Sequence, residues 1–385
     1  MNTYDAIIVG AGYAGSVAAR ALAEKGKKVL ILEQRPHIGG NAYDERDEYG
    51  VLIHTYGPHI FHTSSEKAYR FLTRFTHFND YHHEVLANVH GTMIPVPFNL
   101  NSLAIAFPAE KAARLREKLI SQYGMGSRVP ILKLRESADP ELQELAEYVY
   151  ENIFLHYTAK QWEQKPEEVD PSVTARVPVV VSEENGYFQD PWQGMPEGGY
   201  TEMFEKMLDH ENIDVRLGTP AKDVLQFADG KVLVRDDAAG ELQDYDGLVI
   251  YTGEIDALFD YVHGALPYRS LRFAFEHYEE DSFQEAAVVN YTVSEDYTRI
   301  SEFKKFADPA GQGTTIVKEY PQKHQKGLIP YYAILNDENR ALYQQYKAIA
   351  DRYPKLYLLG RLAEYQYYNM DAITARALEL VEEIG

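Results

Sequence analysis

The sequence predicts an α/β protein in which a discontinuous Rossmann-like domain is interrupted by a helical insertion domain and by an antiparallel β-sheet domain. Three observations support this prediction. A strand pattern, a glycine-rich turn and a helix pattern open the chain, a long middle stretch has helical periodicity, and beyond it the apolar period changes to two. The length of 385 residues also exceeds the roughly 50–250 residues that one domain usually holds.

The start of the chain carries a complete βαβ unit. The apolar run Tyr4–Val9 leads into the turn Gly10–Gly15, and a helical pattern follows that stops at Gly26. A second apolar run, Lys28–Leu32, ends at Glu33, where a carboxylate can hold both hydroxyls of an adenosine ribose. The glycines permit a tight turn, so a pyrophosphate can sit on the helix N-terminus. The alternative is a glycine turn that serves packing alone, and the complete unit favours a bound dinucleotide.

The segment after Glu33 distinguishes between the candidate dinucleotides. Arg35 and the glycine pair Gly39-Gly40 follow the second strand, and NAD-binding domains have no general need for that pair. The segment resembles the E-x-R-x-x-x-G-G stretch of flavoproteins of the glutathione-reductase type, whose backbone passes along the FAD diphosphate. The Rossmann-like domain is therefore predicted to be an FAD-binding domain, and the alternative is a plain turn. The residues expected to contact FAD here are Gly10, Gly12, Tyr13, Ala14, Gly15, Glu33, Gln34, Arg35, Gly39, Gly40 and Asn41.

Helical patterns dominate the next part of the chain. Thr63–Glu66 has the spacing of a capping box that opens a helix. Pro108 begins a second helix, which runs through Tyr123, and Asp139 with Pro140 forms the N-cap and first turn of a third. The buried stripe of the third helix is predicted to comprise Leu142, Leu145, Val149 and Ile153.

Strand patterns follow, and with them the chain divides into domains. Strands of a sheet domain are expected at Leu271–His277, Ala286–Val293 and Thr314–Tyr320. Returns to the nucleotide-binding layer are expected at Thr201–Leu208, Val215–Leu217, Leu248–Thr252, Leu356–Gly360 and Ala372–Ile384. These patterns assign 1–75, 201–265 and 330–385 to the FAD-binding domain, 96–165 to the helical domain, and 76–95, 166–200 and 266–329 to the sheet domain.

Composition and charge exclude several classes of function. With 38 basic and 59 acidic residues the net charge is −21, so wholesale nucleic-acid binding is not expected. The absence of cysteine excludes disulfides, thiolate nucleophiles and cysteine-based metal sites. The N-terminus lacks a signal-peptide pattern and no apolar run reaches about 18 residues, so a cytoplasmic protein without membrane insertion is expected. Thirty tyrosines suit a polar ligand held in a largely dry cleft.

A specific family resemblance is carried by groups of residues spread along the chain. They are Tyr56–Thr63 (YGPHIFHT), Gln193–Pro196 (QGMP), Tyr268–Leu271 (YRSL), Tyr297–Ile300 (YTRI), Gly360–Tyr365 (GRLAEY) and Tyr367–Met370 (YYNM). In this order, from the first strand to the last helix, the sequence resembles the bacterial type of the UDP-galactopyranose mutase family. One departure is Asn369, which stands where many bacterial members have aspartate. A contact with a water or hydroxyl group is therefore expected to be rearranged at this position.

The resemblance implies a flavin-dependent isomerase that interconverts UDP-galactopyranose and UDP-galactofuranose with no net redox change. N5 of reduced FAD is the implied nucleophile at the anomeric carbon, while the protein positions the reactants and stabilises charge. This division of roles between flavin and protein agrees with the motifs, which lack paired acid/base carboxylates. A glycosidase needs such a pair. The resemblance also implies an external reductant such as NAD(P)H, a homodimer, and a place in cell-envelope polysaccharide biosynthesis.

The resemblance also assigns site residues. Arg176 and Arg299 are the expected catalytic clamps on the UDP diphosphate, which gains negative charge as it leaves. Outside these motifs, a surface arginine or a core aromatic would be the ordinary interpretation. Hydroxyl donors to the same diphosphate are expected to be Tyr187, Tyr332 and Tyr367. Uridine and sugar contacts are expected from Phe154, Tyr157, Thr158, Trp162, Asn290 and Asn369, with Trp162 on a mobile lid. Further flavin contacts are expected from His59, Gly360, Arg361, Asn369 and Met370.

The pair His59 and His62 has the H-x-x-H spacing and raises the question of a metal. In an extended loop this spacing does not place both rings on one face, and no cysteine or tight carboxylate cluster completes a ligand set, so no metal is expected. The resemblance places the loop beside the isoalloxazine, with His62 as a catalytic residue that acts through its side chain or its backbone. Other histidines, such as His82 and His83, are expected to be ordinary surface or core residues. The acid-rich stretch Asp236–Glu241 has the pattern of a surface hairpin without an assigned function.

Two other functions remain open. A flavin oxidoreductase of the amine-oxidase type would share the FAD fold but pass a hydride to an acceptor. A non-catalytic flavoprotein would act as a redox-dependent binding module. Counting electrons separates these alternatives, because a mutase turns over many substrates per reducing equivalent, an oxidase does not, and a binding module turns over none.

Overall fold

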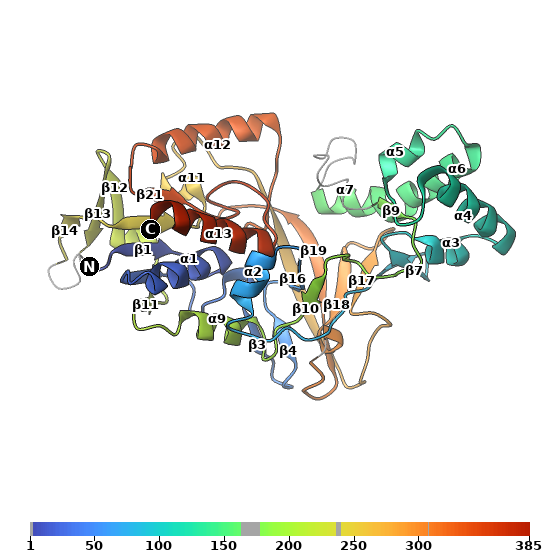
Figure 1. Ribbon diagram of the computed structural model, residues 1–385, viewed down its shortest axis with the longest axis horizontal. Coiled ribbons are helices and arrows are strands. Elements are labelled where there is room, and N and C mark those ends of the chain that lie inside the picture. The colour runs from blue at the N-terminus through green and yellow to red at the C-terminus, as the bar shows by residue number, and fades with distance from the viewer. Residues whose placement is uncertain (1–2, 163–177, 236–239, 307) are drawn as a thin grey trace.

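The computed structural model describes residues 3–162, 178–235, 240–306 and 308–385, and it has three parts arranged along its longest axis (Figure 1). A parallel sheet with its helices lies at the end that holds both termini. A larger sheet lies in the middle. An arm of helices projects at the other end.

Five parallel strands form the first sheet, in the order β11-β2-β1-β15-β21. Their bounds are β1 Ala6–Val9, β2 Val29–Leu32, β11 Ile213–Arg216, β15 Leu248–Tyr251 and β21 Leu356–Leu358. Apart from the edge strand β11 (IDVR), the strands are short apolar runs because both faces of the sheet are covered. Ile8 and Ile31 enter one core, and their neighbours Ile7 and Leu30 enter another. The predicted βαβ opening and the predicted returns of the chain to this sheet are confirmed.

Helices cover one face of this sheet, and helices with a small antiparallel sheet cover the other. The first face carries α1 (Tyr13–Glu24), α9 (Tyr200–Leu208) and α13 (Met370–Ile384). The second carries α10 (Ala221–Val224), α11 (Ile255–Leu258), α12 (Asp337–Ala350), β12 (Leu225–Ala228), β13 (Lys231–Arg235) and β14 (Leu242–Asp244). Residues 236–239 of the predicted acidic hairpin lie outside the described residues, and the flanking strands β13 and β14 are antiparallel.

Seven strands form the middle sheet, in the order β20-β16-β19-β18-β17-β6-β7. They are β6 (Val85–Val89), β7 (Thr92–Val96), β16 (Tyr268–Tyr278), β17 (Val288–Tyr291), β18 (Arg299–Glu302), β19 (Thr314–Lys323) and β20 (Tyr332–Ala333). The prediction of an antiparallel sheet is corrected at one pair, because β6 and β17 run parallel. A period of two shows which residues share a face but not which strand lies alongside or in which direction. Strand β20 also joins this sheet, although residues from 330 onward were assigned to the FAD-binding domain.

The arm consists of helices and one pair of antiparallel strands that lie far apart in the chain. Its elements are α3 (Leu100–Ala106), α4 (Ala109–Tyr123), α5 (Ile131–Arg135), α6 (Pro140–Val149), the π-helical segment η2 (Tyr150–Leu155), α7 (His156–Trp162), β8 (Arg128–Pro130) and β9 (Pro178–Val180). Asp139 caps α6 as predicted, because its carboxylate accepts the backbone N–H groups of Glu141 (2.9 Å) and Leu142 (3.3 Å). The predicted stripe from Leu142 to Ile153 is buried.

The remaining elements connect the two sheets. They are η1 (Gly40–Ala42), β3 (Asp44–Arg46), β4 (Leu52–His54), β5 (Phe61–Thr63), α2 (Glu66–Leu72), β10 (Trp192–Gly194) and η3 (Phe303–Phe306). The predicted N-cap of α2 was wrong: Ser65, not Thr63, accepts the N–H of Ala68. Thr63 belongs to β5, and its hydroxyl accepts the N–H of Ser65 at 2.9 Å and donates to Asp371 in α13 at 2.8 Å. In the described ranges, no helix is long and apolar enough to cross a membrane.

Candidate functional site

The turn between β1 and α1 leaves the first N–H groups of α1 without a side-chain cap. Gly12 is the N-cap, and the first turn of the helix has no acidic residue. Gly15 packs onto the turn itself, because a Cβ there would lie 1.9 Å from the carbonyl oxygen of Gly10. A second glycine turn lies close by, since a Cβ on Gly40 would lie 2.9 Å from the Cα of Gly12. The two turns form a cradle, called here the glycine cradle, at the positive end of α1, which suits a dinucleotide pyrophosphate.

Glu33 and Arg35 flank the glycine cradle. Glu33 is 5% exposed, and its two carboxylate oxygens accept the backbone N–H groups of Ala11 and Arg35, each at 2.8 Å. The guanidinium of Arg35 donates to Asn41 Oδ1 at 2.9 Å and lies 4.4 Å over the ring of Tyr56. Its Nη1 is buried and has no hydrogen-bond partner among the described residues. A half-buried guanidinium with one buried, unpaired donor fits an anionic cofactor such as FAD.

Tyr13 and Gln34, two residues predicted to contact the cofactor, differ in their surroundings. The Tyr13 ring packs edge-on against Tyr200 and Phe204, with centroid distances of 6.4 and 4.9 Å, and burial raises the pKa of its hydroxyl. Gln34 is exposed. Their predicted contact with the cofactor stays a prediction.

The loop after β21 brings a second set of predicted flavin residues to the glycine cradle. Gly360 has a φ of +101°, and a Cβ there would lie 3.3 Å from the Cβ of Ala14 in α1. Arg361 donates from Nε to the carbonyl of Tyr368 at 2.6 Å, and its guanidinium lies 4.4 Å over the ring of Tyr367. Gly360 and Arg361 thereby connect the glycine cradle with a group of tyrosines.

Several predicted substrate residues gather beside the middle sheet. Arg299 in β18 places Nε 3.5 Å from Oε2 of Glu319, whose side chain is 4% exposed. Tyr332 in β20 stacks with Tyr367 at a centroid distance of 6.3 Å. Burial raises the pKa of the Tyr332 hydroxyl, Glu319 raises it further, and Arg299 and Arg361 oppose the rise. A protonated hydroxyl between two guanidinium groups offers a diphosphate several donors. We call Arg299, Glu319, Tyr332, Tyr367 and Arg361 the clamp cluster.

The arm is tied to the middle sheet through Lys160 in α7. Its ammonium group donates to the backbone carbonyls of Tyr291 (2.6 Å), Glu295 (2.9 Å) and Tyr297 (3.3 Å). Burial lowers the pKa of Lys160, and the three carbonyls supply the acceptors that its three N–H groups need. On the adjoining strand, Oδ1 of Asn290 is buried and accepts no hydrogen bond within the described ranges, so it is available to a polar ligand.

Other predicted substrate residues lie in the arm or outside the described residues. Phe154 and Thr158 are buried, at 2% and 4% exposure. The side chains of Tyr157 and Trp162, and the whole of Arg176, lie outside the described residues. The predicted uracil stack, lid and first clamp therefore stay predictions.

The loop between β4 and β5 is held by two histidines. Nδ1 of His54 accepts the backbone N–H of His59 at 3.0 Å, and Nδ1 of His59 lies 2.9 Å from the carbonyl oxygen of Gly57. Burial lowers the pKa of His54 and of His59 to about 4. Both rings are therefore neutral at ordinary pH, and the acceptor nitrogen of His54 fixes the backbone of the loop.

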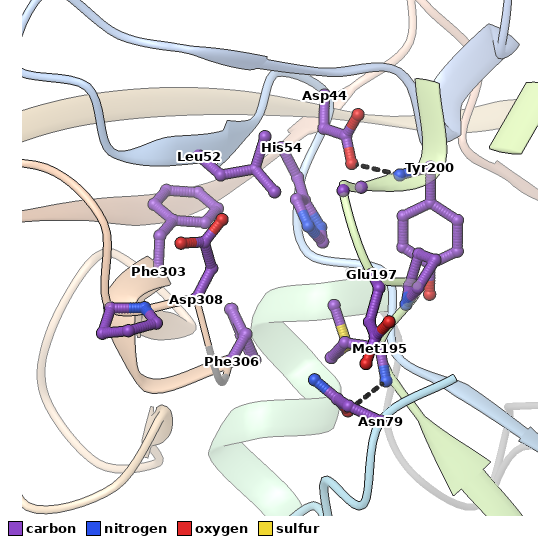
Figure 2. A pocket seen from close by; sticks show the side chains of 14 residues that line it. Asp44, Leu52, His54, Asn79, Met195, Glu197, Tyr200, Phe303, Phe306 and Asp308 are labelled. Atoms are coloured by element: carbon purple, nitrogen blue, oxygen red, sulfur yellow. Dashed lines mark hydrogen bonds between the residues drawn. The ribbon is translucent and has the colours of Figure 1, made fainter. Parts of the chain in front are cut away.

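A cavity of about 160 Å³ lies behind this loop (Figure 2). His54 points into it, and Phe306 lines the same space. Asp44 lies on its wall and accepts the N–H groups of Tyr200 (2.5 Å) and Thr201 (2.8 Å) at the start of α9. No residue predicted for the site lines this cavity, and its residues His54 and Asp44 hold the loop and the start of α9.

His62 belongs to a cluster that sequence reasoning missed. Its Nδ1 lies 2.7 Å from Oδ2 of Asp190, and its ring stacks on Phe188 at 3.6 Å. His83, expected to be an ordinary surface or core residue, is 4% exposed, and burial, together with Arg299 and His62, lowers its pKa to about 3. Its ring also stacks on Phe188, at a centroid distance of 5.7 Å, so His62 and His83 share one stacking partner. No motif surrounds Asp190 or His83, so the sequence offered no signal for either.

The N-terminus of α13 completes the surroundings. Asn369 is the N-cap and makes no side-chain capping bond, and Met370 is the first residue of the helix. Asp371 in the same turn accepts the hydroxyl of Thr63, so α13 is fixed to β5 beside His62. Across the described part of the chain, no three His, Asp or Glu side chains gather as a metal site would need.

Comparisons with known proteins extend over the whole chain. A family model for UDP-galactopyranose mutase matches residues 152–367, and one for NAD(P)-binding Rossmann-like domains matches residues 8–75. The chain is 36% identical to a probable UDP-galactopyranose mutase of Klebsiella pneumoniae, with 100% of this chain and 95% of that protein covered. It is 34% identical to a dTDP-fucopyranose mutase of Escherichia coli, with 98% and 97% covered. The fold matches a crystal structure of reduced UDP-galactopyranose mutase with a TM-score of 0.71 and 16% identity, covering 100% of this chain and 94% of that one.

Proposed function

Because the chain belongs to the UDP-galactopyranose mutase family, we propose that it interconverts UDP-galactopyranose and UDP-galactofuranose. The observation that carries the proposal is the position of the clamp cluster, whose arginine Arg361 follows Gly360 and so adjoins the glycine cradle. Donors suited to a sugar-nucleotide diphosphate thus lie beside residues suited to a dinucleotide cofactor. The reaction is an isomerisation without net redox change.

The cofactor is a flavin, and the residues present fit FAD. The uncapped N-terminus of α1 and the buried Nη1 of Arg35 offer donors to its diphosphate, and Glu33 stands at the ribose end of the glycine cradle. When bound in its reduced form, FAD supplies the lone pair of N5 as the nucleophile for the anomeric carbon. The chain's own residues bind the cofactor and the substrate, orient them and stabilise the charge that develops in the reaction.

Departure of UDP from the anomeric carbon places negative charge on its diphosphate. The guanidinium of Arg299 stabilises that charge. The buried carboxylate of Glu319 holds the guanidinium in place before the substrate arrives. The hydroxyl of Tyr332 stays protonated because burial raises its pKa, so it remains a hydrogen-bond donor over the working pH range. Arg176 supplies the second guanidinium in this proposal. The sugar ring can then open and close while the diphosphate stays bound.

A second substrate is favoured by one comparison. The identity to the dTDP-fucopyranose mutase, 34% over nearly the whole chain, is close to the 36% identity to the UDP-galactopyranose mutase relative. dTDP-fucopyranose carries the same diphosphate, so the clamp cluster would serve both substrates equally. The two differ in the base, in the 2′-hydroxyl of the nucleoside and in the 6-hydroxyl of the sugar.

We further propose that an external reductant such as NAD(P)H maintains the reduced flavin and that the enzyme is a homodimer. Support for both comes from the family to which the chain belongs. A mutase consumes no electrons in turnover, so the reductant is needed only to reduce the flavin initially and to restore it after adventitious oxidation.

The experiment that tests the proposed substrate uses the dithionite-reduced holoprotein. UDP-galactofuranose and dTDP-fucofuranose are incubated separately with it, and the nucleotide sugars are resolved by chromatography. The proposal expects conversion of UDP-galactofuranose to the pyranose with the higher kcat/KM. Preferential conversion of the dTDP sugar would establish the second substrate instead, and conversion of neither would refute the proposed function.

A further inference from the structure

Asp190 makes a set of contacts that fixes one imidazole ring in place. Its Oδ2 lies 2.7 Å from Nδ1 of His62, its Oδ1 accepts the hydroxyl of Ser64 at 2.6 Å, and its backbone carbonyl accepts Nε2 of Gln193 at 3.0 Å. The pairing of β5 with β10 places Gln193 opposite His62. The side chains of His62 and Asp190 are 18% and 26% exposed.

We propose that Asp190 is a positioning residue for the mutase reaction, which fixes His62 as the tautomer protonated at Nδ1 and leaves its Nε2 as an acceptor. This inference rests on the proposed function and deepens it.

The tautomer follows from the chemistry of the pair. A carboxylate accepts hydrogen bonds but donates none, so the ring nitrogen that faces Asp190 must carry the proton. In a neutral imidazole the other nitrogen is then an acceptor. His54 shows the opposite arrangement, because its Nδ1 accepts the N–H of His59 and its Nε2 carries the proton. The chain thus builds both tautomers within one loop, each selected by its partner.

The orientation of the ring is fixed in two ways. Stacking on Phe188, at a centroid distance of 3.6 Å and an interplanar angle of 12°, sets the plane of the His62 ring. The bond to Asp190 sets its rotation within that plane. Ser64 in turn holds the carboxylate, so that the carboxylate, the imidazole and the strand form one rigid unit.

The place of this unit connects it with the reaction. The rings of His62 and His83 both stack on Phe188, at centroid distances of 3.6 and 5.7 Å. Arg299 contributes to the lowered pKa of His83, which agrees with a clamp cluster near these rings. On the other side, Thr63 of the same strand is bonded to Asp371 in the first turn of α13. His62 is therefore connected with His83 through Phe188 and with the helix that follows Asn369 through the neighbouring Thr63. In the proposal, Nε2 of His62 meets a group of the substrate or cofactor.

A spectroscopic measurement tests the tautomer directly. In the holoprotein labelled with [¹⁵N]histidine, the His62 resonances, assigned by their loss in His62→Gln, are expected to show Nδ1 protonated and Nε2 unprotonated. Asp190→Asn is expected to shift His62 toward the Nε2-protonated form, since the amide NH₂ can donate to Nδ1. Asp190→Glu keeps the acceptor and is expected to retain the wild-type tautomer. A tautomer unchanged in Asp190→Asn would overturn the proposal.

Kinetics test whether the positioning matters for turnover. Asp190→Asn is expected to lower kcat about 10–100-fold with little change in KM, because Asp190 acts through His62. The double variant His62→Gln/Asp190→Asn is expected to be no slower than His62→Gln alone. A further loss in the double variant would show that Asp190 acts by another route and would overturn the proposal.

A matched control is available in the same protein. Asp80 pairs with Nε2 of His82 at 3.2 Å, but their side chains are 99% and 67% exposed. Asp80→Asn makes the same chemical change in an exposed pair and is expected to leave kcat unchanged. The tautomer is measured in the resting holoprotein, so failure of the positioning proposal can be told apart from failure of the proposed function. If the proposed function were wrong, the wild-type protein would show no turnover.

Discussion

The glycine cradle and the clamp cluster are built in different ways. The glycine cradle is made of backbone from two neighbouring turns, Gly10–Gly15 and Gly39–Gly40, and the turns pack closely because their glycines lack a Cβ. The clamp cluster is made of side chains that β18, β19, β20 and the loop after β21 bring together from separate parts of the chain. The glycine cradle is therefore sensitive to substitutions that add side-chain atoms, and the clamp cluster is sensitive to substitutions that remove them. Changes in the glycine cradle should affect folding and FAD content, and changes in the clamp cluster should affect turnover.

The largest effect is expected in the clamp cluster. Arg299→Ala removes about two charge-assisted bonds to the diphosphate, worth roughly 3–6 kcal/mol together. This corresponds to a fall of about 10²–10⁴ in kcat/KM under reducing conditions, with normal FAD content. Arg299→Lys should recover only part, because an ammonium group cannot reproduce the fork of a guanidinium.

The control for this prediction is Arg272, which is exposed and lies over the ring of Tyr320 at 3.9 Å. Arg272→Ala should change kcat/KM by less than about 0.5 kcal/mol in free-energy terms. An Arg299→Ala variant that kept most of the wild-type kcat/KM would show that Arg299 is not a clamp.

The glycine cradle should respond with a loss of stability. Gly15→Ala would place its Cβ against the carbonyl oxygen of Gly10, and forcing the turn apart should cost about 3 kcal/mol. Gly12→Ala meets only ordinary contacts at 3.6 Å, so it should fold normally but bind FAD more weakly, because its Cβ points toward the pyrophosphate region. Thermal melts and flavin absorbance of the two variants separate the effects. Equal stability of Gly15→Ala and wild type would contradict this view of the turn.

A pH effect is expected from His83, beside the clamp cluster. Its pKa of about 3 in the folded state lies below the unfolded value of about 6.5, so between these values the unfolded chain binds a proton that the folded chain does not. The free energy of unfolding therefore loses nothing from His83 above about pH 6.5. It falls as the pH drops below that value, by roughly 2 kcal/mol at pH 5.

Denaturant unfolding of His83→Asn as a function of pH measures this contribution. The variant should lose less stability between pH 7.5 and pH 5 than the wild type. His82→Asn is the matched control, because the neighbouring His82 has a side chain that is 67% exposed. An identical pH dependence in wild type and His83→Asn would show that His83 is not buried as a neutral ring.

The smallest effect is expected at the N-terminus of α13. Asn369 makes no capping bond, and Asn369→Asp would place a negative charge at the positive end of the helix. The change should raise the free energy of unfolding by about 0.5 kcal/mol. Denaturant unfolding at low and high salt measures it, since the gain should shrink as salt screens the charge. A loss of stability would indicate that Asp371 repels the added charge more strongly than the helix attracts it.

The same contrast explains how much the sequence could predict. The glycine cradle, the cap at Asp139 and the buried stripe of α6 were predictable because each depends on residues a few positions apart. The order of elements around the parallel sheet followed from apolar runs of strand length and helical periods.

The rest depends on partners that are distant in the chain. Thr63 is not the helix cap because it belongs to β5, where its hydroxyl accepts the N–H of Ser65 and donates to Asp371, 308 residues away. Asp190 is separated from His62 by 128 positions, and no local pattern marks it. His83 looked ordinary because only the folded chain brings Arg299 and His62 beside it. Family resemblance predicted the two arginine clamps. The residues that contact Arg299, such as Glu319, and its neighbour His83 could be identified only from the fold.

Electron counting tests the central claim most directly. The holoprotein is given one equivalent of dithionite per flavin without oxygen, then excess UDP-galactofuranose, and the nucleotide sugars and the flavin spectrum are followed together. We expect many molecules of UDP-galactopyranose per flavin while the flavin stays reduced, and no conversion by the oxidised protein. Equal conversion by the oxidised protein, or flavin oxidation in step with product, would contradict a mutase that depends on reduced FAD without consuming its electrons.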